Sequence, residues 1–272
     1  MDDLIDIGAN LAHESFEEDL DAVINRAHAT GVAQIVVTGS DADSNRRAAE
    51  LSRAYPGQLH ATAGLHPHHA DQADADLYAQ ITASARDGQI VAVGETGLDF
   101  FRDLCPRPIQ ERVFARQLEI AAATGLPVFL HQRDAHDRFI AVLREHRDAL
   151  GDCVVHCFTA DRRALFECLD LDCHIGITGW ICDERRGRHL LDMVDSVPAE
   201  RLMIETDAPY LMPRSIRPKP RTRRNEPMHL PHVLTRLAEA RGTAPEALAR
   251  STSATARAFF RIAETPAERK VS

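Results

Sequence analysis

Histidines and carboxylates stand at the ends of several short apolar runs in this sequence. Glu95, His131 and His156 each come within two residues of the end of such a run. Neutral imidazole nitrogens and carboxylate oxygens are common protein ligands of Zn²⁺, Mn²⁺ and Fe²⁺. For one histidine alone, an ordinary loop hydrogen bond is the simpler explanation. Because the pattern recurs at three consecutive runs, we expect the three side chains to hold one divalent cation.

Two more polar residues follow other apolar runs. Asp207 could bind the metal through oxygen or accept a proton from a metal-bound water, and its alternative role is to cap a helix. His66 lies in a cluster of three histidines around Pro67. It could steady a substrate phosphate, donate a proton or cap a loop.

The elements that would position these residues are eight short apolar or β-branched runs, each followed by a longer segment with helical spacing. The runs are 4–7, 34–37, 59–63, 90–93, 127–130, 153–155, 174–177 and 202–204. Their starts lie about 20 to 40 residues apart, which leaves room for a strand, a helix and two loops each time. This pattern predicts an α/β fold of the TIM-type (β/α)8 barrel class, whose active site lies at the carboxyl ends of the strands.

Two of the intervening segments carry clear helix signals. Ser15 and Glu18 form a capping-box pattern, and Gly31 is expected to end the helix that follows. Pro231 is expected to open a later helix that ends at Gly242.

The composition indicates one folded domain rather than a disordered or fibrous chain. Of the 272 residues, 44% are hydrophobic and 27% are charged, close to the averages for globular domains. We expect a single barrel over residues 1–265 with a short tail over 266–272. The acidic start and the lack of a long apolar stretch argue against a signal peptide and a membrane span, so we expect a cytoplasmic protein. The six scattered cysteines are expected to be reduced.

A stretch rich in proline and basic residues follows the eighth run. Prolines at five positions between 209 and 227 predict a long, stiffened loop over residues 209–231. In a chain of net charge −9, this loop holds six basic residues and no acid among them: Arg214, Arg217, Lys219, Arg221, Arg223 and Arg224. Such a cluster of positive charge could bind the phosphate backbone of a nucleic acid. We expect Arg221, Arg223 and Arg224 to contact the phosphates. The alternative is that neighbouring acids pair with this cluster.

Other candidates for nucleic-acid contacts lie just past predicted strands. Arg133 could contact the scissile phosphate or pair with Asp134 or Asp99. Five aromatic residues could stack on the bases of a single strand or plug the barrel under its loops, with Trp180 as our first choice: Phe100, Phe101, Phe158, Trp180 and Tyr210.

Together these motifs resemble the ordered set of the TatD family of metal-dependent deoxyribonucleases. The matching segments are 65–68 (LHPH), 94–99 (GETGLD), 131–135 (HQRDA), 156–159 (HCFT) and 205–209 (ETDAP), with further likeness to the TatD branch at 176–187 and 223–227. The resemblance implies that Glu95, His131 and His156 hold the metal, that Asp207 is a ligand or base beside it, and that His66 contacts the substrate. It also implies phosphodiester hydrolysis, and for the TatD branch Mg²⁺-dependent 3′-to-5′ exonuclease action on single-stranded DNA and RNA.

The end of the first run departs from the family pattern. Many relatives carry His-x-His there, whereas this chain has Gly8 and Asn10. We therefore expect one well-held ion, with a second recruited by the substrate phosphate and Asp207, rather than a symmetric pair. Fewer imidazoles shift the expected metal toward Mg²⁺, with Mn²⁺ or Zn²⁺ as alternatives.

Two other functions use the same features. A small-molecule amidohydrolase or esterase would share the barrel and ligands but would not need a basic track. A bridging carboxylated lysine is disfavoured, because Lys219 and Lys270, the two lysines, end no predicted strand. A non-catalytic binding protein is the second alternative. We expect a monomer with no obligate protein partner.

Overall fold

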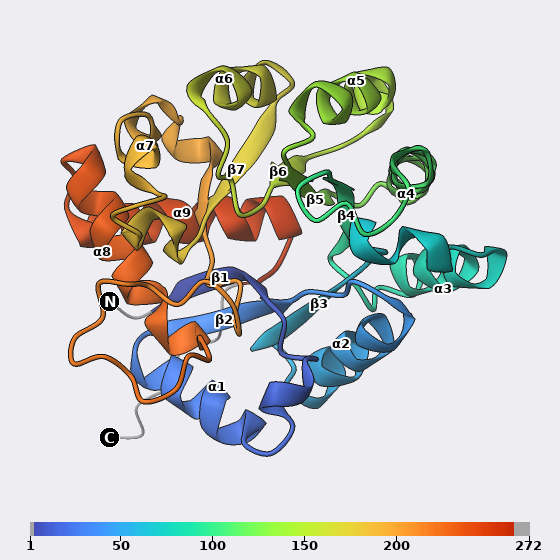
Figure 1. Cartoon of the computed structure of the whole chain (residues 1–272). Coiled ribbons are helices and arrows are strands. Elements are labelled where there is room, and N and C mark those ends of the chain that lie inside the picture. The colour runs from blue at the N-terminus through green and yellow to red at the C-terminus, as the bar shows by residue number, and fades with distance from the viewer. Residues whose placement is uncertain (1–2, 264–272) are drawn as a thin grey trace.

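The computed structural model describes residues 3–263 and shows a barrel of eight parallel strands in sequential order (Figure 1). The strands are β1 (Leu4–Ala9), β2 (Val32–Val37), β3 (Leu59–Ala63), β4 (Ala92–Asp99), β5 (Val128–Arg133), β6 (Cys153–Val155), β7 (Cys173–Ile177) and β8 (Leu202–Ile204). A parallel bridge between Ala9 and Ala208 brings the chain after β8 back to β1. The predicted (β/α)8 barrel is confirmed.

All eight predicted runs form strands, and the largest difference lies in β4 and β5. We expected these strands to stop at residues 93 and 130, but they continue to Asp99 and Arg133. The backbones pair as far as Asp99 and Arg133, so their polar side chains do not end the ladder. Glu95 and His131 therefore stand on strands rather than on loops.

Helices surround the sheet on the outside (Figure 1). They are α1 (Leu20–Ala29), α2 (Ala42–Ala54), α3 (Ala75–Arg86), α4 (Arg107–Thr124), α5 (His136–His146), α6 (Arg162–Asp170), α7 (Arg188–Leu191), α8 (Leu230–Arg241) and α9 (Pro245–Phe260). The predicted limits of α8 are confirmed, because Pro231 lies in its first turn and Gly242 caps it in a left-handed conformation.

The capping box predicted at Ser15 and Glu18 is wrong. Residues Glu14–Phe16 form a short 3₁₀ turn, and the Ser15 backbone N–H donates to the His13 ring, so the chain bends before the helix begins at Leu20. Gly31 follows the helix with φ +89°, as expected for a terminating glycine.

The lower end of the barrel is closed by α9. Phe259 and Phe260 of this helix pack with strand residues that point into the barrel at its amino-terminal end, among them Ile5, Phe129 and Met203. A plugged lower end leaves the carboxyl ends of the strands as the open face.

Three of the outer helices begin near that face with an aspartate N-cap: α2 at Asp41, α3 at Asp74 and α6 at Asp161. The Asp74 side chain accepts a 2.8 Å hydrogen bond from the Leu77 backbone N–H. We predict that Asp74→Ala lowers the free energy of unfolding by about 1 kcal/mol. The measurement is the shift in urea midpoint, with Asp76→Ala as the control because this exposed neighbour caps nothing. Equal shifts in the two variants would contradict the prediction.

No helix among residues 3–263 is long and apolar enough to cross a membrane. The six cysteines are free, and five of them are buried. The expected tail 266–272 and Lys270 lie outside the described residues.

Candidate active site

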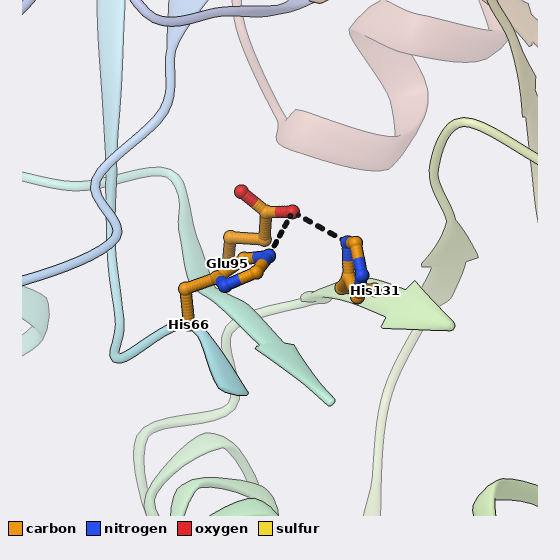
Figure 2. Close-up of side chains that lie close together, drawn as sticks. All are labelled: His66, Glu95 and His131. Atoms are coloured by element: carbon orange, nitrogen blue, oxygen red, sulfur yellow. Dashed lines mark hydrogen bonds and ion pairs between the residues drawn. The ribbon is translucent and has the colours of Figure 1, made fainter. Parts of the chain in front are cut away.

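A carboxylate oxygen surrounded by imidazoles lies at the carboxyl ends of β3 to β6. Glu95 Oε1 is 2.7 Å from His156 Nε2, 2.9 Å from His131 Nδ1 and 3.4 Å from His66 Nε2. Figure 2 shows the His66 and His131 rings on either side of Glu95. The structure brings the three predicted ligands together and adds His66, whose position allows it to be a ligand as well as a substrate contact.

Burial and neighbouring charges both shift the pKa values in this cluster. Burial alone would raise the pKa of Glu95, but the surrounding imidazoles outweigh burial and hold the pKa well below its usual range. Burial lowers the pKa values of His131 and His156, but the carboxylates beside them outweigh burial and raise both, so a metal bound to these rings would displace protons. Burial lowers the pKa of His66 and so favours its neutral ring. Because Nδ1 accepts a hydrogen bond from the His68 backbone N–H, the proton of this neutral ring lies on Nε2, which can donate to Glu95 or to a phosphate. An ionised carboxylate that meets imidazole nitrogens is a donor set for a divalent metal.

Buried carboxylates back two of the imidazoles from the opposite side. Glu205 Oε2 lies 3.3 Å from His156 Nδ1, and Asp99 Oδ2 lies 3.3 Å from His131 Nε2. Each ring is thus held between Glu95 and a second carboxylate, which fixes its orientation and its tautomer. Glu205 had no predicted role, and Asp99 was expected only as a possible partner of Arg133. Their place in the strand-end segments GETGLD and ETDAP was the available signal.

His68, one of the three histidines around Pro67, also lies at the site. Its Nε2 atom lies 2.7 Å from Asp99 Oδ2, the oxygen that also faces His131. Its position two residues after His66 put it within the histidine cluster, but spacing alone did not show which carboxylate it would meet.

Asp207 joins the site from the chain after β8. Its Oδ1 atom accepts a 3.1 Å hydrogen bond from the Asn10 side chain, and it lines the same pocket as Glu95. Its φ of 53° is left-handed, a conformation that few non-glycine residues adopt. Burial raises the pKa of Asp207 to about 7, although the nearby His156 opposes this rise. A carboxylate beside the cluster suits the predicted roles of ligand or base.

Packing explains why Gly8 stands where many relatives carry the first histidine of His-x-His. A Cβ atom at this position would lie 2.5 Å from Glu205 Oε2, and one at Gly176 would lie 2.6 Å from Glu205 Oε1. The two glycines leave room for the carboxylate that backs His156. In this chain, the end of β1 therefore accommodates Glu205, and Asn10 binds Asp207.

The cluster lies in a pocket of about 430 Å³ on the open face of the barrel. Its walls include His66, Asp207 and Arg133 together with Trp180, Arg186 and Tyr210. This volume is near the lower end of the range for ligand pockets, about 300–1,000 Å³.

Arg133 does not pair with Asp134 or Asp99, the acids considered from the sequence. Its guanidinium lies over the Phe101 ring, 4.0 Å from the centroid, and 5.7 Å from that of Trp180. Among residues 3–263, no carboxylate forms an ion pair with it. Its charge therefore lies at the pocket wall, where a phosphate could approach it.

The long loop after β8 is irregular from 205 to 226, in agreement with the prediction, but its basic residues divide into two groups. Arg214 pairs with Glu184 at 3.0 Å, and Arg224 pairs with Asp19 and Glu226, each at 2.8 Å. Arg224 is therefore an anchor that fastens the loop to α1, which corrects its expected role as a free phosphate contact (Figure 1).

Of the other four basic residues of the loop, Arg217 donates hydrogen bonds to the backbone carbonyl oxygens of Arg214 and Ile216. Lys219, Arg221 and Arg223 are exposed, and none forms an ion pair with an acid in the described part of the chain. Their role in binding the phosphate backbone of a nucleic acid stays a prediction.

The anchor of this loop has a testable pH dependence. Hydrogen bonds from Arg224 and Arg26 hold the pKa of Asp19 at about 2, below the ordinary 3.8, so this pairing stabilises the fold above about pH 4 and is lost as the pH falls toward 2. We predict that Asp19→Asn costs about 1 kcal/mol or less near pH 7 and speeds tryptic cleavage after Arg221 and Arg223. Thermal midpoints of both proteins should converge as the pH falls below about 4. A difference that is constant with pH would contradict this assignment.

The aromatic residues that follow the strands differ in their exposure to solvent. Phe158 is buried and belongs to the core, so of its two predicted roles the structure favours the plug under the loops over base stacking. Phe101 and Tyr210 are 55% and 51% exposed, whereas Trp180 is half-buried and packed against the core.

A parallel (β/α)8 barrel with a carboxylate and imidazole cluster at the carboxyl ends of its strands defines the class of metal-dependent hydrolases. The chain belongs to the family described as TatD related DNase, whose sequence model matches residues 5–261.

Individual relatives match almost end to end. The chain is 48% identical to a 3′-5′ ssDNA/RNA exonuclease TatD of Pectobacterium parmentieri, over 96% of this chain and 100% of that protein. It is 46% identical to the protein of the same name in Salmonella typhimurium, over 95% and 99% of the two chains. The crystal structure of a TatD homolog from Escherichia coli superposes with a TM-score of 0.87 at 28% identity, over 96% and 98% of the two chains.

Proposed function

We propose that this protein is a metal-dependent phosphodiester hydrolase that removes nucleotides from the 3′ end of single-stranded DNA and RNA. The observation that carries the proposal is the convergence of His156, His131 and His66 on one Glu95 oxygen at the carboxyl ends of the strands. Relatives named as exonucleases of this polarity cover almost the whole chain, which supports the same activity here.

In this proposal Glu95, His131 and His156 hold the metal, with Asp207 as a further ligand or as the base. When bound, a divalent ion would activate a water and offset the negative charge of the phosphate. We propose Mg²⁺, with Mn²⁺ and Zn²⁺ as alternatives, because carboxylate oxygens take a large share in the donor set.

The chain's own residues would orient the substrate. His66 and Arg133 line the pocket and can donate hydrogen bonds to phosphate oxygens. Asp207 faces the same space and can accept the proton that the attacking water loses. Lys219, Arg221 and Arg223 would hold the phosphate backbone of the strand outside the pocket, an attraction that weakens as salt rises.

The size of the pocket favours removal of single nucleotides. A space of about 430 Å³ is about the size of one nucleotide, which suits the removal of single nucleotides from a strand end. We propose cleavage from the 3′ end because the relatives are named 3′-5′ exonucleases. The monomeric state and the cytoplasmic location stay predictions.

The test is digestion of a 5′-labelled single-stranded oligonucleotide by chelator-stripped protein, with and without Mg²⁺. We expect a metal-dependent ladder that shortens from the 3′ end and that a 3′-terminal block prevents. Internal cutting of the blocked strand would contradict the exonuclease proposal. Intact strands under both Mg²⁺ and Mn²⁺ would direct attention to ester and amide substrates.

A further inference from the structure

An exposed aromatic ring stands on the loop between β4 and α4, beside the pocket. Phe101 is 55% exposed, and the Arg133 guanidinium covers part of it at 4.0 Å from the ring centroid. Arg133 and Arg102 line the pocket, whereas Phe101 is not part of its lining. The ring therefore lies next to the pocket mouth with much of its surface open to solvent.

A stack of rings and cations supports Phe101 from behind. The Trp180 ring lies 5.7 Å from the Arg133 guanidinium, and the Arg186 guanidinium lies 4.2 Å from the Trp180 centroid. Asp183, which is buried, holds Arg186 by a 2.9 Å ion pair. Trp180 is thus covered by guanidinium groups, and Phe101 is the exposed end of the stack. Trp180 therefore supports the stack and lines the pocket wall, whereas Phe101 is the exposed ring beside the pocket mouth that a strand outside the pocket can reach.

The backbone of Phe101 is tied to the metal centre. Asp99 Oδ1 accepts hydrogen bonds from the backbone N–H groups of Phe101, at 3.0 Å, and Arg102, at 2.7 Å. The other oxygen of Asp99 faces His131, a proposed metal ligand, at 3.3 Å. One buried carboxylate therefore fixes both the ring's loop and a ligand of the site, so Phe101 keeps a set position relative to the reacting phosphate.

We propose that Phe101 is the stacking platform for the base of the penultimate nucleotide, on the part of the strand that remains after cleavage. This inference rests on the proposed exonuclease function. The terminal nucleotide occupies the pocket, so the next base lies outside the pocket mouth, where Phe101 is. Every nucleobase has a π face that can stack on an aromatic ring, so the platform accepts any sequence and either DNA or RNA.

The test measures binding rather than cleavage. Chelator-stripped protein is titrated into a 5′-fluorescein-labelled oligothymidine at fixed salt, and the Kd is read from fluorescence anisotropy. We expect Phe101→Ala to weaken binding about tenfold, as stacking energies of single bases predict, and Phe101→Trp to retain it. Leu104→Ala is the matched control, because Leu104 is a 65% exposed apolar residue of the same loop without a ring.

A substrate without one base locates the platform. An oligonucleotide that is abasic at the penultimate position should bind wild-type protein about tenfold more weakly, and Phe101→Ala should lose nothing further. The same abasic change far from the 3′ end should have no effect on either protein. An equal abasic penalty in wild type and Phe101→Ala would overturn the proposal, as would unchanged binding by Phe101→Ala of the intact strand.

The outcomes separate this inference from the function on which it rests. If wild-type protein shows the Phe101-dependent binding but hydrolyses no strand under Mg²⁺ or Mn²⁺, the exonuclease proposal fails and the platform stands. If digestion proceeds from the 3′ end but Phe101→Ala binds as wild type does, the platform fails alone. Protein that binds no oligonucleotide would overturn both.

Discussion

The Glu95→Ala variant is expected to lose tight metal binding and about a thousandfold of its hydrolysis rate. Glu95 Oε1 is the atom on which three imidazole nitrogens converge, and the side chain is buried at the base of the pocket. Without the Glu95 carboxylate, the imidazoles would have to hold a metal ion without the negative charge on which they converge. Calorimetric titration of chelator-stripped protein with Mn²⁺ measures the first loss, and oligonucleotide digestion measures the second.

Controls separate this effect from damage to the fold. Glu95→Gln keeps the shape of the side chain and removes the charge, so it should resemble Glu95→Ala in metal affinity. Glu246→Ala removes an exposed glutamate at the start of α9, at the opposite end of the barrel, and should leave both measurements unchanged. Mn²⁺ binding by Glu95→Ala with the wild-type affinity would refute the proposed metal centre.

The second large effect is expected at Glu205, which touches no substrate. We predict that Glu205→Gln weakens metal binding about 10- to 100-fold, the usual cost of losing a carboxylate behind a ligand histidine. Glu205 is fully buried, with one oxygen facing His156 Nδ1 at 3.3 Å and the other accepting a 2.5 Å hydrogen bond from the Cys157 backbone N–H. The amide can donate from its NH₂ group to His156 Nδ1, which would favour the tautomer with its proton on Nε2, the nitrogen that faces Glu95.

The readout must show that the change acts through His156. The Mn²⁺ affinity, the thermal midpoint and the ¹⁵N imidazole signals of the histidines report metal binding, folding and tautomer separately. Glu205→Gln should shift the His156 tautomer and the affinity together. A loss of stability with the wild-type affinity and tautomer would show that Glu205 has only a packing role.

Much of the active site followed from local sequence. Each strand is a short apolar run because its residues face either the barrel interior or the surrounding helices, and Leu59–Ala63, Cys153–Val155 and Leu202–Ile204 have the predicted bounds. In a parallel barrel the carboxyl ends of all strands meet on one face. For this reason Glu95, His131 and His156 could be predicted to converge although they lie far apart in the chain.

Tertiary structure decided which polar groups meet across the barrel. Arg224 pairs with Asp19 more than 200 positions away, and Glu205 fits against His156 because Gly8 of β1 and Gly176 of β7 leave room for it. Local patterns also failed to distinguish the buried Phe158 from the exposed Phe101, although both follow strands. Apolar periodicity and strand order are properties of neighbouring residues, so the sequence by itself determined the barrel and the ligand-bearing strand ends. Ion pairs, the backing carboxylates and the exposure of single rings depend on distances between segments remote in the chain, and these are set only when the whole barrel has packed.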